Sequence, residues 1–183
     1  DNIFPHHENE IAQSCCALDS KFVNYWIHNE HLSVEGQKMS KSLGNFYTIR
    51  DLLKKGYRAD AIRYALISSH YRQKLNFTFD RLDDAQKSIN KLKELLRRLN
   101  AINEKYICIN NEYLDKTKKF IDNFNKHLSD DLNISGSLGE LFIWANFLFK
   151  IIDKKNISYK QSRDAIERLK KVDKILCVIE VKD

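Results

Sequence analysis

A loop with two lysines is the first feature of this sequence that could take part in chemistry. Lys38, Met39, Ser40, Lys41 and Ser42 precede a Leu-Gly-Asn run, so two ammonium groups stand three residues apart among small and polar residues. Lysine is a flexible point charge with three donors, and it suits the negative charge that builds on a departing pyrophosphate. The loop is therefore a candidate polyphosphate-binding segment, and the alternative is a solvated loop with two surface lysines.

Metal-capable side chains form a second candidate group near the start of the chain. His6 and Glu10 are four residues apart, just ahead of an apolar-periodic segment. On a helix this spacing puts both on one face, where an imidazole and a carboxylate can bind the same ion. Pro5 fits the first turn of such a helix. The alternative is an acidic helix start with exposed histidines, because two ligands alone do not complete a tetrahedral site.

Three segments that include both groups resemble cysteinyl-tRNA synthetase, a family of class I aminoacyl-tRNA synthetases. The segments are F-P-H-H-E-N-E-I-A-Q-S from Phe4 to Ser14, F-V-N-Y-W-I-H from Phe22 to His28, and K-M-S-K-S-L-G-N-F from Lys38 to Phe46. Further on, Asp60-Ala61-Ile62-Arg63 is similar to the D-A-L-R signature of the helical domain that follows the catalytic core, and the run 130–133 resembles another family stretch.

The resemblance implies ATP-dependent activation of L-cysteine to cysteinyl-adenylate, followed by its transfer to tRNA(Cys). Lys41 would stabilise the leaving phosphates and Lys38 would assist, with Met39, Ser40 and Ser42 completing the ATP-binding loop. ATP would act with Mg²⁺. The resemblance favours His6 over its neighbour His7 as the partner of Glu10 in binding Zn²⁺, and zinc would separate cysteine from serine because it prefers a thiolate.

Other family elements are missing from this sequence. The H-I-G-H motif and two zinc-binding cysteines of the family do not occur in it, and the chain begins with Asp1. We therefore expect a fragment that, alone, neither forms the adenylate nor binds zinc tightly. The expected parts are the end of a Rossmann-like α/β catalytic domain (1–47), connecting helices (48–78) and a tRNA-binding helical bundle of the DALR anticodon-binding type (79–183).

Composition limits the class of protein. The chain has 183 residues and a net charge of +6, with the positive excess after residue 50, as a polyanion partner requires. The lysines there alternate with acids, which is also typical of a solvated helix face. No stretch approaches the roughly 20 apolar residues of a membrane span. The four cysteines lack C-x-x-C spacing, which favours reduced thiols in the cytoplasm, with Cys108 and Cys177 packed as small hydrophobic residues. We expect a monomer.

Elements that position the two groups can be read from spacing. Phe22–His28 and His31–Val34 are expected as short strands or extended pieces, with Gly36 turning the chain into the lysine loop. Thr48 and Asp51 form a capping box for a helix through Lys55, and a second helix covers 59–69.

The remainder is mainly α-helical. A heptad seam of six residues predicts one long helix: Leu82, Ala85, Ile89, Leu92, Leu96 and Leu99. A second seam follows it: Leu114, Thr117, Ile121, Phe124 and Leu128. The apolar run 138–152, with Trp144, predicts a third and most buried helix, and Ser158 with Gln161 caps a fourth whose stripe is Ala165, Leu169, Val172 and Leu176. Together they predict an antiparallel bundle.

Three other functions remain open from sequence. One is a related ligase that activates cysteine in the same way but joins it to an amino sugar; it would share the zinc and ATP elements and differ in the tRNA-directed bundle. The second is a tRNA-binding module that has lost catalysis. The third is a purely structural bundle, which the intact lysine loop disfavours.

Overall fold

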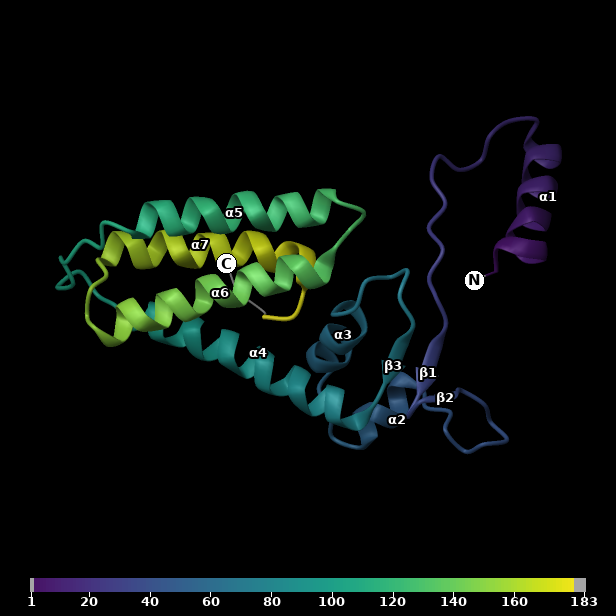
Figure 1. Cartoon of the computed structure of the whole chain (residues 1–183), viewed down its shortest axis with the longest axis horizontal. Helices are drawn as coiled ribbons and strands as arrows, with labels where there is room; N and C mark the ends of the chain where they lie inside the picture. The colour runs from purple at the N-terminus through teal and green to yellow at the C-terminus, as the bar shows by residue number, and fades with distance from the viewer. Residues whose placement is uncertain (1, 180–183) are drawn as a thin grey trace. The chain divides into compact units, whose positions relative to one another are not determined.

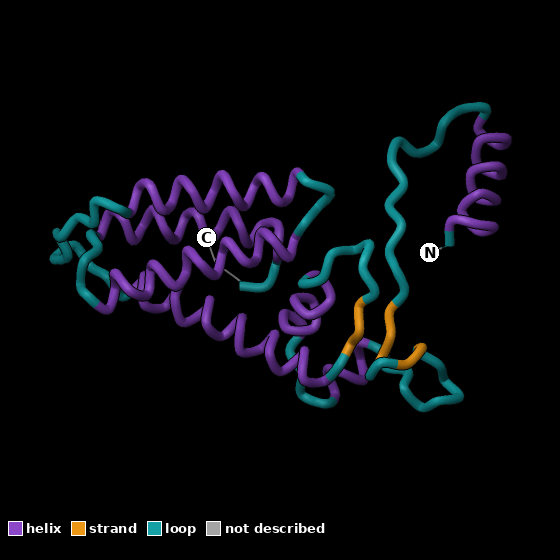
Figure 2. Tube along the Cα trace, in the orientation of Figure 1, coloured by secondary structure: helices purple, strands orange, loops and turns teal. Residues whose placement is uncertain are grey.

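The computed structural model describes residues 2–179 and divides them into two compact units. Unit 1 contains residues up to Phe46 together with Tyr71–Phe77, and unit 2 contains Tyr47–His70 and the chain from Thr78 onward. Most of the described chain is helical, with a few short strands (Figure 2). No helix within residues 2–179 is both long and apolar enough to cross a lipid bilayer.

Unit 1 begins with a short π-helical turn, η1 (Ile3–His7), that leads into α1 (Glu8–Leu18). No side chain of α1 is buried. The following segment, Phe22–His28, forms no strand, so of the two extended pieces only the second becomes part of a sheet.

The sheet of unit 1 has the strand order β2-β1-β3. β1 (Leu32–Val34) pairs in parallel with β3 (Leu75–Phe77) and antiparallel with β2 (Gln37–Lys38). The turn from β1 to β2 needs positive φ at both central residues, and Glu35 and Gly36 have φ of 49° and 76°. The sequence predicted a turn at Gly36, and β2 ends at Lys38, the first residue of the lysine loop.

Unit 2 opens with two short helices whose caps were predictable. In α2 (Ile49–Lys54), Thr48 and Asp51 form the expected capping box, and Gly56 follows with φ of 91°. The second helix, α3 (Ala59–Ile67), ends two residues before the predicted boundary.

Four long helices occupy residues 79–176 and pack side by side (Figure 1). They are α4 (Phe79–Asn100), α5 (Tyr113–Ser129), α6 (Ile134–Asp153) and α7 (Tyr159–Leu176). Consecutive helices run in opposite directions, as predicted for an antiparallel bundle. α6 is apolar and central: its Trp144 is 2% exposed, stacks on Phe120 at a centroid distance of 4.5 Å and donates its Nε1–H to Thr117.

Details of the predicted seams differ from the structure. In α4 the buried residue is Leu95 and not Leu96, because a straight helix with 3.6 residues per turn drifts away from a strict heptad. In α5 the predicted Thr117 and Phe124 are buried, but the other buried positions are Tyr113 and Phe120, and Leu114 is 73% exposed. The stripe of α7 is buried as predicted. Cys108 and Cys177 are exposed, so their assignment to packing positions was wrong.

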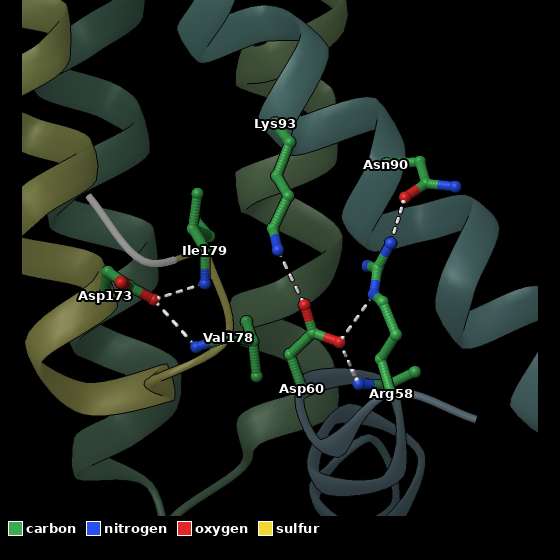
Figure 3. Close-up of polar contacts among 8 residues, drawn as sticks. Arg58, Asp60, Asn90, Lys93, Asp173, Val178 and Ile179 are labelled. Atoms are coloured by element: carbon green, nitrogen blue, oxygen red, sulfur yellow. Dashed lines mark hydrogen bonds and ion pairs between the residues drawn. The ribbon is translucent and has the colours of Figure 1, made fainter. Parts of the chain in front are cut away.

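A polar cluster in unit 2 connects α3 to α4 (Figure 3). Asp60 accepts hydrogen bonds from the Arg58 Nε at 3.0 Å and the Lys93 Nζ at 2.7 Å, and its carboxylate also accepts from the backbone N–H of Ala61. Burial favours a higher pKa for the Asp60 carboxyl, but the hydrogen bonds from Arg58 and Lys93 outweigh it and hold the pKa below its usual value. The charged Asp60 carboxylate therefore links α3 to α4.

The other charged residue of the D-A-I-R run connects α3 to the end of α7. The Arg63 guanidinium donates to the carbonyl oxygens of Leu176 and Ile175, which lie in the last turn of α7 and lack helical partners. Just beyond, Asp173 accepts from the backbone N–H groups of Val178 and Ile179 (Figure 3). The D-A-I-R run thus fixes α3 against two helices of the bundle.

Candidate functional site

The lysine loop lies in unit 1 and is closed by one side chain. The Asn45 Oδ1 accepts a hydrogen bond from the backbone N–H of Ser40 at 2.8 Å, and the Asn45 Nδ2–H donates one to the carbonyl oxygen of Lys38 at 3.1 Å. These two bonds tie the end of the loop to its beginning. Within the loop, the hydroxyl groups of Ser40 and Ser42 lie 2.7 Å apart. Sequence reasoning assigned no role to Asn45, although an asparagine directly after a glycine is a common sign of a tight loop.

The two lysine side chains of the loop are accessible to an anion. Lys38 and Lys41 are exposed, and the Lys41 Nζ lies 5.6 Å from the centroid of the Phe46 ring, which is 44% exposed. A cation over an aromatic face is held only weakly at an exposed site, by about 0.5–1 kcal/mol. Lys41 can therefore leave the ring for a stronger, doubly charged partner. Gly44, with φ of 66°, gives the loop its sharp return.

The proposed metal ligands occupy consecutive helical turns in unit 1. His6 is the fourth residue of η1 and Glu10 lies in the first turn of α1; both side chains are exposed. An imidazole nitrogen and a carboxylate oxygen are donors that zinc accepts, so this pair fits two positions of a zinc site. Within residues 2–179, no group of three or more potential metal ligands comes together.

Aromatic rings surround His7, the neighbour of the proposed ligand. The His7 ring centroid lies 4.9 Å from that of His28 and 5.1 Å from that of Trp26, while the Trp26 and His28 rings are nearly parallel with centroids 6.2 Å apart. The His7 Nδ1 and the His28 Nε2 are buried atoms without a hydrogen-bond partner. Desolvation, and then the nearby His28 and His6, hold the pKa of His7 below its usual value.

Sequence reasoning treated these rings separately and did not predict that they meet. Trp26 and His28 lie two residues apart in the segment Phe22–His28, which the sequence predicted only to be a short strand or an extended piece. The available signal was their spacing, because residues two apart on an extended chain point to the same side. The contact of both with His7 depends on how the chain folds back after α1, which the spacing does not reveal.

Comparison with known proteins first identifies the class. Residues 1–87, which contain the lysine loop, the His6/Glu10 pair and the ring cluster, match the family model described as the catalytic domain of class I (C) tRNA synthetases. The lysine loop and the pair of metal-capable residues therefore lie in the part of the chain that is similar to a class I aminoacyl-tRNA synthetase catalytic domain.

Individual relatives narrow the class further. The chain is 47% identical to a cysteine–tRNA ligase of Brachyspira hyodysenteriae, 41% to one of Protochlamydia amoebophila and 43% to one of Leptospira interrogans. Each match covers 98% of this chain, including the helical bundle, and between 37% and 39% of the relative. The chain thus matches cysteinyl-tRNA synthetases over nearly all of its own length, and it spans somewhat over a third of the length of these relatives.

Proposed function

We propose that the protein containing this chain ligates L-cysteine to tRNA(Cys) in an ATP-dependent reaction with a cysteinyl-adenylate intermediate. The observation that carries the proposal is the match to cysteine–tRNA ligases over 98% of the chain, bundle included. A ligase that joins cysteine to an amino sugar would share the catalytic elements but would not need a tRNA-directed bundle. The match over the bundle therefore favours tRNA as the acceptor.

In the proposed reaction, the lysine loop acts on the leaving group. The cysteine carboxylate attacks the α-phosphorus of ATP and pyrophosphate departs, so negative charge grows on the β- and γ-phosphates, where Mg²⁺ also binds. The Lys41 ammonium stabilises that charge, and Lys38 assists from the start of the loop. No protein nucleophile is required, because catalysis consists of positioning and charge stabilisation. Asn45 supports the proposal, since its two hydrogen bonds hold the loop that presents both lysines.

In the proposed substrate site, His6 and Glu10 would be two of the ligands of a zinc ion. When bound, zinc supplies a Lewis acid that prefers a thiolate to a hydroxyl group and lowers the pKa of a thiol. A site that offers a bond only cysteine can form rejects serine better than a site that senses size alone. His6 and Glu10 are both exposed, in the turn that precedes α1 and in the first turn of α1.

The bundle is the proposed tRNA-binding part. The exposed side of α5 carries several lysines that can neutralise phosphates: Lys116, Lys118, Lys119 and Lys126. The net charge of +6 is consistent with this role. The monomeric state, the cytoplasmic location and the assignment of the bundle to the DALR anticodon-binding type stay predictions.

Pyrophosphate exchange tests the first half-reaction. The intact protein, supplied with ATP, Mg²⁺ and cysteine, is expected to exchange labelled pyrophosphate into ATP, while serine supports exchange at least about 100-fold less well because it cannot offer a thiolate to the metal. Removing zinc with a chelator should abolish the preference, and adding zinc back should restore it. Equal exchange with serine, or exchange that a chelator leaves unchanged, would contradict the zinc assignment.

A further inference from the structure

The rings of His7, Trp26 and His28, here called the ring stack, lie beside the proposed zinc ligands and have no role in the proposed reaction. Two residues of the stack come from the segment after α1, and the third comes from the turn that precedes α1. Phe22 makes an edge-to-face contact with Trp26 at a centroid distance of 5.8 Å. Ring contacts of this kind have a preferred geometry and so restrict orientation as well as distance.

The stack is the main side-chain anchor of this helical turn. α1 buries none of its side chains, and η1 buries none either. His7, by contrast, is half-buried and has its Nδ1 removed from solvent. Consecutive residues on a helix point about 100° apart, so fixing the direction of the His7 ring also fixes the directions in which His6 and Glu10 project.

We propose that the ring stack positions the zinc-binding turn, with His7 as a positioning residue that aims His6 and Glu10 at the metal. The inference rests on the proposed function, because it requires that these two residues bind zinc. It assigns to His7, Trp26 and His28 a part in metal affinity that does not involve direct contact with the metal. Residues that orient metal ligands typically contribute about 10- to 100-fold to affinity.

The alternative, in which His7 and His28 themselves bind the metal, makes a different prediction. Their rings are tilted by 34° at a centroid distance of 4.9 Å, and the His7 Nδ1 and the His28 Nε2 have no hydrogen-bond partner. In that case a nitrogen atom of His7, and not its ring surface, would be required for zinc binding.

Zinc affinity of variants of the intact protein tests the inference. The zinc dissociation constant would be measured by competition with a chromophoric chelator. His7→Phe keeps a flat ring and removes the unpaired buried nitrogen, so its affinity should stay within about threefold of the parent. His7→Ala and Trp26→Ala each remove one side of the stack and should weaken zinc binding about 10- to 100-fold. Tyr25→Ala is the matched control, since Tyr25 is 86% exposed in the same segment, and it should change nothing.

The outcomes separate the inference from the proposed function. If His7→Phe loses as much zinc affinity as His7→Ala, the nitrogen and not the ring surface is needed, and the positioning role is overturned. If His7→Ala and Trp26→Ala both bind zinc like the parent, the stack is irrelevant to the metal. His6→Ala serves as the reference: if it retains full zinc affinity, the proposed metal site itself fails, whatever the stack does. A global folding defect in His7→Ala is recognised by circular dichroism and leaves Trp26→Ala and His7→Phe as the decisive pair.

Discussion

Replacing Lys41 by alanine is expected to slow formation of cysteinyl-adenylate in the intact protein by about 100- to 1,000-fold, the usual effect of removing one preorganised donor from a developing negative charge. In the proposed reaction, additional negative charge develops on the leaving pyrophosphate as the bond to the α-phosphorus breaks, so the ammonium group stabilises the transition state more than the ground state. Because the proposed cysteine site does not include the loop, cysteine binding should be almost unchanged. Single-turnover measurement of adenylate formation, together with the cysteine dissociation constant, separates the two effects.

The matched control is Lys21→Ala, an exposed lysine of unit 1 outside the loop. It removes the same charge from the surface and should leave both quantities as they are. For Asn45→Ala the rate of adenylate formation is expected to lie between those of Lys41→Ala and Lys21→Ala. This variant keeps the ammonium groups but loses the two hydrogen bonds that join the ends of the loop. An equal loss of cysteine binding and adenylate formation in Lys41→Ala would remove the role assigned to Lys41.

Replacing Asp60 by alanine is expected to lower the free energy of unfolding of the chain by about 2–3 kcal/mol, mainly through lost charge-assisted hydrogen bonds. The Asp60 side chain is only 9% exposed and accepts from Arg58, Lys93 and the Ala61 backbone. Its two cationic partners are 40% and 34% exposed and regain water, which keeps the loss below that of a fully buried pair. Urea unfolding followed by circular dichroism measures the change.

A second carboxylate on the same bundle provides the comparison. Asp84 pairs with Lys87 at 2.9 Å, but both side chains are more than 70% exposed, so Asp84→Ala should change stability by less than about 0.5 kcal/mol. Asp60→Asn keeps the shape of the side chain and one acceptor oxygen, so its loss of unfolding free energy should lie between those of Asp60→Ala and Asp84→Ala. If Asp60→Ala and Asp84→Ala unfold at the same urea concentration, the hydrogen bonds of Asp60 contribute nothing to stability.

Helices were predictable in this chain because their signals are local. Thr48 with Asp51 and Ser158 with Gln161 form capping boxes that the structure contains as predicted. The burial of Trp144 also follows from an apolar run too dense for a surface helix. The choice between Leu95 and Leu96 was missed because a strict heptad ignores the drift of a straight helix, which brings Leu95 to the face of α4 that packs against α6 and α7.

Some residues of the candidate site were predictable from local signals in the same way, and others were not. The lysine loop and the His6/Glu10 pair are contiguous or helically spaced, so their residues could be named from the sequence alone. Asn45 and the ring stack were missed because each depends on contacts across a chain reversal: Asn45 bonds to residues five and seven positions earlier, and His7 meets rings about twenty residues later. Such contacts follow from the path of the backbone, which residue type and spacing do not specify.

The central proposal, that the protein containing this chain joins cysteine to tRNA, is tested most directly by following labelled cysteine. The intact protein would be incubated with labelled cysteine, ATP, Mg²⁺ and zinc, in parallel with a tRNA(Cys) transcript and with an amino sugar. The account predicts that cysteine becomes esterified to the tRNA and that the amino sugar remains unmodified. Transfer of cysteine to the amino sugar, or binding of the tRNA without any attached cysteine, would contradict it.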